Sequence, residues 1–128
     1  MKPYQVALAG LAAGFALGAA AIEGLHAQAK PPAFYIAMND VKDADGYINN
    51  FSKESSAYAK AQGGRFIVQG GKVTALAGEP PKTRVVVEQW ESMDKLLAWF
   101  NSPKNQDLQK AAAQYATLHS FAVEGLPQ

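Results

Sequence analysis

Glu88 is the residue of this 128-residue chain whose type and position most favour acid-base chemistry. It stands in the run RVVVEQW, directly after Val87 and two positions before Trp90. A carboxyl group in the middle of so apolar a strand becomes buried if it points into the protein, and burial raises its pKa toward neutrality. The sequence therefore indicates Glu88 as a candidate acid or base.

His119 is the second candidate catalytic residue, because an imidazole titrates near neutral pH and can also ligate haem iron. It lies in the run HSFAVEG, near the start of a predicted last strand. An ordinary strand-end histidine with one hydrogen bond is the simpler interpretation, since the chain has no cysteine and its other histidine, His26, lies in the N-terminal signal segment at 1–29. No metal site of the usual His-rich or Cys-rich type is expected, and no cofactor is predicted.

Further polar and aromatic side chains are candidates for lining the same pocket as Glu88. The candidate ligand-binding residues are Tyr35, Asn39, Tyr47, Arg65, Arg84 and Trp90. Arg84 stands four positions before Glu88 and so shares its strand face. A structural pairing of Arg84 with a carboxylate is the alternative interpretation, and aromatic residues are more often core than ligand contacts.

The stretch GGRFIVQGG at residues 63–71 resembles a phosphate-binding loop only in its glycines. A phosphate cradle needs a helix N-terminus after the glycines, whereas here a strand follows each pair. Gly63-Gly64 instead predicts a left-handed helix end, and Gly70-Gly71 a two-residue hairpin turn. A net charge of +1 without a basic stripe also argues against a nucleic-acid partner.

The first 29 residues have the order of a secretory signal. Lys2 precedes an uncharged apolar stretch at 6–22, and Ala27-Gln28-Ala29 supplies the small residues that a signal peptidase needs. We expect cleavage after residue 29, a periplasmic or secreted location, and no membrane contact afterwards. An uncleaved anchor helix is the alternative. Residues 30–33 then form an extended leader and residues 34–126 one domain.

The domain sequence predicts the order β-α-β-β-α-β with a broken second helix. The predicted strands are 33–41, 65–68, 83–90 and 119–125, and the second strand has a further arm at 72–76. The first predicted helix runs from the Asp43 cap to residue 62. The second runs from Ser92 to Asn101 and restarts at Ser102-Pro103. This order is typical of the α+β ferredoxin-like fold, a four-stranded antiparallel sheet with its helices on one face. The helix after Ser92 is expected to bury Met93, Leu96, Leu97 and Phe100.

The strand at 83–90 is apolar on both faces, which bears on assembly. Val85 and Val87 point to one side of the sheet, and Val86 and Trp90 to the other. A strand of this kind is expected to be covered on both faces, and one short domain has only enough helices for one. The sequence therefore predicts a homodimer in which two sheets pack face to face.

Several runs together resemble one bacterial family. GGRFIVQGGKVTALAGE, RVVVEQW followed by ESM, AWFNSP and the terminal AVEG are similar to domain-of-unknown-function family 1330 (DUF1330), from about Tyr35 to Gly125. The resemblance implies a member of the dimeric α+β-barrel superfamily, but no common reaction. The chain departs from the family pattern where Asn105 replaces a tyrosine and where Gln89 replaces a glutamate, with Glu88 one step earlier and so on the opposite sheet face.

Two functions follow as hypotheses. The first is an exported dimeric module that binds a small, largely apolar organic molecule or stabilises an assembly, without turnover. The second is a cofactor-free isomerase or oxygenase, in which Glu88 or His119 moves a proton. Haem binding is a third alternative, because the resemblance extends to a superfamily in which some members bind haem.

Overall fold

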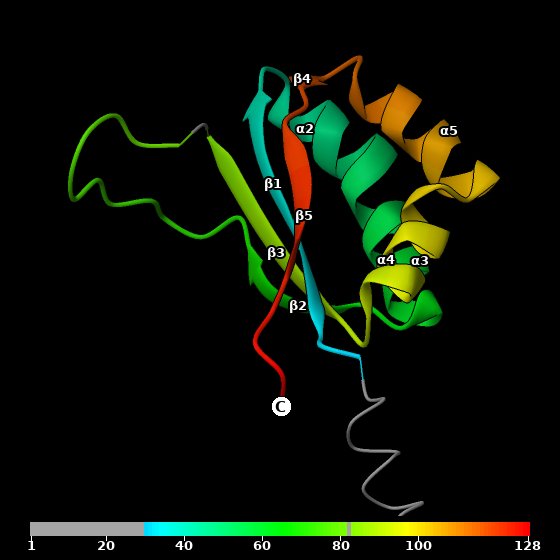
Figure 1. Ribbon diagram of the computed structural model, residues 1–128. Coiled ribbons are helices and arrows are strands. Elements are labelled where there is room, and N and C mark those ends of the chain that lie inside the picture. Colours follow the sequence, from blue (N-terminus) through cyan, green and yellow to red (C-terminus); the bar gives the residue numbers. More distant parts are fainter. Residues whose placement is uncertain (1–29, 82) are drawn as a thin grey trace, which may run out of the picture. The chain divides into compact units, whose positions relative to one another are not determined.

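The part of the chain that the structure describes folds as an antiparallel sheet with its helices on one face (Figure 1). The computed structural model describes residues 30–81 and 83–128, so the predicted signal segment lies outside the described residues. The elements are β1 (Ala33–Val41), α2 (Ala44–Tyr47), η1 (Ile48–Ser52), α3 (Lys53–Gln62), β2 (Arg65–Gln69), β3 (Arg84–Trp90), α4 (Met93–Phe100), α5 (Pro103–Ala112), β4 (Ala116–Thr117) and β5 (Ser120–Glu124). The predicted ferredoxin-like α+β architecture is confirmed.

The strands β1 and β3 form the centre of the sheet. They pair antiparallel, with Tyr35 opposite Glu88 and Asn39 opposite Arg84, while β2 flanks β3 and β5 flanks β1. Buried and half-buried residues alternate along both strands, as the two-residue period of a sheet requires. The predicted division of the valines between the two faces is therefore confirmed, and Glu88 lies on the helix-covered face with Trp90.

The helical run after β1 contains a turn that the sequence did not reveal. Its start is as predicted, because the Asp43 carboxylate accepts a hydrogen bond from the Gly46 amide at 3.0 Å. Its end is also as predicted, because Gly63 has φ 112° in the left-handed region. Between these caps, however, η1 is a π-helical turn of five residues joined directly to α2 and α3.

The predicted strand arm at 72–76 is wrong. Residues 72–76 form no strand, and the loop that contains them extends away from the helices (Figure 1). β2 is the edge strand of the sheet, and within the described residues its outer edge stays unpaired because the chain does not turn back onto it after Gly71. The predicted two-residue turn is therefore wrong as well, although Gly70 has a positive φ, 71°.

The helix α4 begins and ends where the sequence predicts, and α5 begins at the predicted residues. The hydroxyl oxygens of Ser92 and Ser102 each accept a hydrogen bond from the amide three residues later, at 3.3 Å. Leu96 is fully buried in the core, but Leu97 is 43% exposed, contrary to the predicted stripe. The sequence analysis missed Trp99, which is buried and stacks on Trp90 with ring centroids 4.8 Å apart.

The opposite face of the sheet carries no helix and is largely apolar. Its central positions, Ile36 and Val87, are only half-buried, and Phe121 and Val123 of β5 are 49% and 45% exposed. We call this surface the open face and the helix-covered surface the covered face. Within residues 30–81 and 83–128, the structure contains no helix of the length and apolarity that crossing a membrane requires.

Candidate functional site

A small cleft lies between the covered face of the sheet and the helical segments η1 and α3. Its floor is made by Ala37 of β1 and its neighbour Val86 of β3, which are the smaller residues of the two strands at this level. Phe51, Ser52 and Ser55 lie above them. The cavity volume is about 30 Å³, which is room for roughly two water molecules.

One end of the cleft is formed by Glu88 and Tyr35, which face each other across β3 and β1. The Glu88 side chain is buried, with only 3% of its residue surface exposed, and its Oε1 atom has no hydrogen-bond partner. Burial raises the pKa of Glu88 to about 7, and the neighbouring Trp90 indole offsets part of that rise. Trp90 Nε1 still lacks a hydrogen bond of good geometry, so the indole does not satisfy the carboxyl group fully.

Tyr35 shares this environment. Burial raises the pKa of its hydroxyl to about 12, and the charge of Glu88 adds to the rise, while a hydrogen bond with the Ser120 side chain opposes it. The ring packs edge-on against Trp99, with centroids 5.1 Å apart. Tyr35 is therefore a neutral hydrogen-bonding group at physiological pH, and Glu88 is the group at this end that changes charge near neutrality.

The other end of the cleft is formed by Asn39, Tyr47 and Arg84. The Asn39 amide nitrogen donates to the Tyr47 hydroxyl at 2.9 Å, and its Oδ1 atom accepts from the backbone amide of His119 at 3.1 Å. These two bonds fix the buried Asn39 side chain. Burial raises the pKa of Tyr47, while the Asn39 hydrogen bond and the Arg84 charge counteract it.

The Arg84 guanidinium has weak partners. Its Nη2 atom donates to the Ser52 hydroxyl at 3.4 Å, and the group lies over the Tyr47 ring with its Cζ atom 5.5 Å from the centroid. Its Nε atom is buried and unpaired. Among residues 30–81 and 83–128 no carboxylate forms an ion pair with Arg84, so the alternative interpretation of a structural carboxylate partner is wrong.

The two remaining ligand-binding candidates lie outside the cleft. Arg65 pairs with Gln89 on the open face and is exposed. Trp90 is 1% exposed and belongs to the core, where it touches the site only through its indole next to Glu88.

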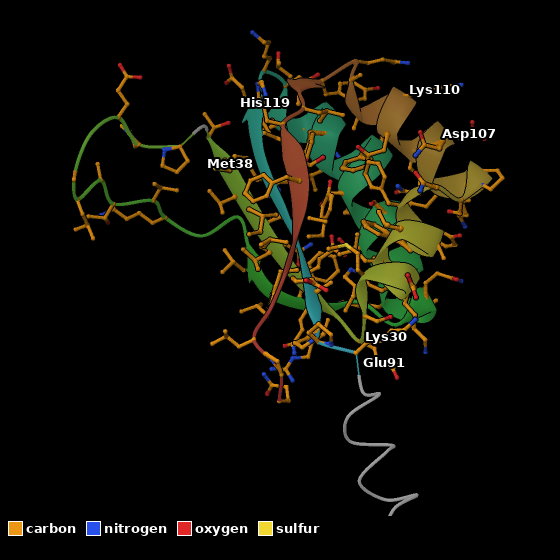
Figure 2. All side chains as sticks on the ribbon, in the orientation of Figure 1. Lys30, Met38, Glu91, Asp107, Lys110 and His119 are labelled. Carbon is orange, nitrogen blue, oxygen red and sulfur yellow. The ribbon has the colours of Figure 1, made fainter. Side chains whose placement is uncertain are left out.

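His119 also lies away from the cleft. It is exposed between β4 and β5, and its side chain borders a shallow hollow with Met38, Pro80 and Pro81 (Figure 2). Met38 points to the open face, because it alternates with the buried Ala37 and Asn39. The structure therefore brings Glu88 together with Tyr35, Asn39, Tyr47 and Arg84, but not with the second catalytic candidate.

Several lining residues were missed by the sequence analysis. They are Phe51, Ser52, Ser55, Ser56, Phe66, Gln69, Trp99 and Gln109. Trp99 had a usable signal, because it stands three positions after Leu96 on one helical face. Gln69 had none: a β-bulge between Phe66 and Val68 turns it toward the cleft, where its amide donates to Ser56 Oγ at 2.7 Å.

The unsatisfied polar atoms define what this cleft can do. Arg84 Nε and Trp99 Nε1 are donors without acceptors, and Glu88 Oε1 has no partner. Buried polar atoms are nearly always hydrogen-bonded in folded proteins, so a group of unpaired ones around one cavity is typical of a site that a polar molecule completes. In the part of the chain that the structure describes, no three His, Cys, Asp or Glu side chains lie close enough to hold a metal ion.

Comparisons with known proteins agree on family and fold. The family described as "Domain of unknown function (DUF1330)" matches residues 32–126. No curated protein sequence matches the chain.

Three solved structures illustrate the likeness of fold. A protein of unknown function from Rhodopseudomonas palustris has a TM-score of 0.60 at 14% identity, covering 83% of this chain and 92% of its own. A putative antibiotic biosynthesis monooxygenase from Caulobacter crescentus has a TM-score of 0.56 at 15% identity, covering 81% of this chain and 98% of its own. SnoaB, a cofactor-independent oxygenase from Streptomyces nogalater, has a TM-score of 0.55 at 12% identity, covering 77% of this chain and 96% of its own. At these identities the likeness concerns the fold alone, which is the dimeric α+β barrel of the antibiotic biosynthesis monooxygenase type.

Proposed function

The chain belongs to the DUF1330 family, and from that premise we propose that it is an exported, homodimeric protein whose covered-face cleft binds a small organic molecule. The observation that carries the proposal is the set of unpaired buried polar atoms around the cleft, above all Glu88 Oε1 and Arg84 Nε. Leaving such atoms without partners disfavours folding by about 1–3 kcal/mol each. A ligand that supplies the missing partners recovers that free energy on binding.

The shape of the cleft supports the same proposal. Ala37 is buried at the centre of the floor, where a larger side chain would fill the space. Polar groups stand at both ends and apolar groups lie between them, which is the usual composition of a small-molecule site. The ligand is therefore less uniformly apolar than the sequence alone suggested.

The test is a substitution that fills the cleft. We expect a library of small metabolites to contain compounds that raise the melting temperature of the wild-type protein but not that of Ala37→Leu. The matched control is Ala57→Leu, which adds the same atoms at an exposed position of α3. A ligand that stabilises Ala37→Leu and Ala57→Leu equally would place binding elsewhere and contradict the proposal.

A second candidate function is proton transfer without a cofactor, and one observation favours it. With a pKa of about 7, Glu88 is half-ionised at neutral pH and so can both take and give a proton. The similarity of fold to a cofactor-independent oxygenase is compatible with this chemistry but does not assign it.

This second function is tested by hydrogen exchange at carbon. Pyruvate and acetone serve as probes in D₂O, and the loss of their methyl proton signals is followed by NMR. If the protein is an enzyme of this type, wild type accelerates the exchange of at least one probe and Glu88→Gln does not. Equal rates with wild type, Glu88→Gln and no protein would leave binding without turnover as the function.

The assembly and the location belong to the proposal as well. The apolar open face supports a dimer in which the two sheets pack together. The signal segment at 1–29 supports export. The purified protein is expected to sediment as a dimer at micromolar concentration. Mass spectrometry of the exported form is expected to find Lys30 at its N-terminus; a retained leader would contradict cleavage.

A further inference from the structure

We propose that the ligand of the cleft is a short carboxylate carrying a second oxygen group, a hydroxy or oxo acid, and that its binding is coupled to protonation of Glu88. This inference rests on the proposed function, because it concerns the same cleft. It adds the chemical class of the ligand and the orientation in which the ligand lies.

The two ends of the cleft differ in charge, which requires two different groups on the ligand. Arg84 supplies a permanent positive charge and an unpaired Nε donor at one end. Glu88 and Tyr35 stand at the other end, with the apolar pair Ala37 and Val86 between. An anionic group is complementary to the first end, and a neutral oxygen to the second.

An unpaired arginine on the wall of a cleft favours an anion in particular. Arginine side chains in the interior of proteins pair with carboxylates or phosphates, and Arg84 has neither among the described residues. Its contacts, the Ser52 hydroxyl at 3.4 Å and the Tyr47 ring, hold the guanidinium in place without neutralising it. The planar group matches the two oxygens of a carboxylate.

The size of the cleft limits the ligand. A cavity of about 30 Å³ takes the place of roughly two water molecules. This space favours a two-carbon acid over a phosphate ester or an aromatic acid. Arg84 and Glu88 are four residues apart on one strand, so their Cα atoms are separated by roughly 13 Å, with Val86 between them on the same face.

Protonation of Glu88 follows from the sign of the ligand. An ionised Glu88 would repel a bound carboxylate and could not donate a hydrogen bond to the ligand's second oxygen. The other titratable or charged groups that line the cleft are Tyr35 from β1, Tyr47 from α2 and Arg84 from β3. The lining residues from β2, η1, α3, α4 and α5 are all neutral. Glu88 is therefore the group at the cleft whose charge changes near pH 7.

The experiment compares three probes of nearly equal size by calorimetry: glycolate, acetate and glycolamide. Acetate lacks the hydroxyl group, and glycolamide lacks the charge. At pH 5.5 we expect glycolate to bind at least about tenfold more tightly than either of the others, since acetate lacks the hydroxyl group that Glu88 would bind and glycolamide lacks the charge that Arg84 would bind. Above pH 7, glycolate affinity is expected to fall about tenfold per pH unit, because each binding event then takes up one proton.

Two variants separate the roles of the two ends. Glu88→Gln cannot ionise, so it is expected to bind glycolate with equal affinity at pH 5.5 and pH 8.5. Its binding enthalpy is expected to be the same in buffers of different ionisation enthalpy, which would show that binding takes up no proton. Arg84→Gln is expected to lose the preference for glycolate over glycolamide. Arg84→Lys keeps the charge and is expected to retain that preference, which guards against a variant that simply folds poorly.

The outcomes are distinct. Equal affinity for glycolate and glycolamide in wild type, or an unchanged pH dependence in Glu88→Gln, would overturn the inference. If none of the three probes binds while another compound stabilises wild type but not Ala37→Leu, the ligand class is wrong and the proposed function stands. If no compound stabilises the wild-type protein, both are wrong.

Discussion

Each face of the sheet departs from the usual pattern of an apolar covered face and a polar exposed face. The covered face, under the helices, holds Asn39 and Glu88 with 5% and 3% of their surfaces exposed. The open face presents Ile36, Val87 and Phe121 without a covering layer in the protomer. In most antiparallel sheets the covered face is apolar and the other face is polar.

This comparison teaches that neither face is explained by the stability of one isolated protomer. Buried polar groups without partners destabilise the fold, and an exposed apolar face promotes association. The open face is explained if a second copy covers it, and the covered face is explained if a ligand occupies its cleft. The two explanations are independent, so each can be tested without the other.

The largest effect is expected on the open face. Ile36 lies opposite both Val87 and Phe121, so Ile36→Glu puts a carboxylate at the centre of the proposed interface. Burying that charge disfavours dimerisation by about 3–5 kcal/mol, and sedimentation velocity is expected to show monomers. Leu126→Glu is the control, since Leu126 follows β5 and is 82% exposed. A dimeric Ile36→Glu would show that another surface makes the dimer.

The next effect concerns the covered face and its dependence on pH. The pKa of Glu88 rises from 4.5 to about 7 on folding, so between these pH values the folded state binds more protons than the unfolded state. The stabilisation is fully present below pH 4.5 and is lost as pH rises to about 7, a change of about 3 kcal/mol in the free energy of unfolding.

Urea unfolding from pH 4.5 to 8 measures that change. Glu88→Gln is expected to remove the downward slope, because glutamine does not titrate. Glu91→Gln is expected to leave the slope in place, since Glu91 is exposed and its pKa is lowered by Lys95. A slope that survives in Glu88→Gln would assign the pH dependence to another group.

A smaller effect is expected where the covered face is closely packed, at Gly64 next to the Trp90 ring. At Gly64 an added Cβ would lie 2.7 Å from the Trp90 ring, whereas at Gly71 it would meet nothing within 4 Å. Gly64→Ala is expected to lower the free energy of unfolding by about 2 kcal/mol through overpacking. Gly71→Ala is expected to change it little. Urea titration of both proteins measures the two losses of stability, and equal losses would argue against steric crowding at Trp90.

The smallest effect lies in the helical layer itself. The Ser102 hydroxyl caps α5, accepts from Tyr58 Oη at 3.0 Å and donates to the Trp99 carbonyl at 2.7 Å. Ser102→Ala is expected to lower stability by about 1–2 kcal/mol. Ser92→Ala removes one cap bond only and should lose less, so the reverse ranking by urea unfolding would contradict this account.

The sequence predicted the features that local chemistry determines. The capping residues Asp43, Ser92 and Ser102 act through neighbours three residues away, so their roles are readable from spacing alone. The alternation in β3 was readable for the same reason, and it correctly separated Val86 and Trp90 from Val85 and Val87. Five of the candidate site residues lie together because they alternate on two paired strands or follow the Asp43 cap.

The sequence could not predict features that depend on distant parts of the chain. His119 was chosen for its chemistry, but its direction is set by the short β4 pairing that leads into β5. Arg65 lies on the open face because Phe66, next to it, is opposite Glu88 on the covered face. The strand predicted at 72–76 has suitable residues, but the chain does not turn back at Gly71 to pair them with the edge strand β2, which the local sequence does not show.

The π-helical turn at η1 has an evolutionary consequence. A π turn holds one residue more than the α turn it replaces, so the insertion of a single residue into a helix is enough to form one. Deleting one residue from 48–52 would restore an ordinary α-helix between the Asp43 cap and Gly63, but would rotate Tyr47 by about 100° relative to α3. The sheet would keep its pairing, while the wall that Ser52 and Ser55 present to the cleft would be replaced. Length variation of one residue at this turn therefore gives such a scaffold a way to change what its cleft accepts without redesigning its strands.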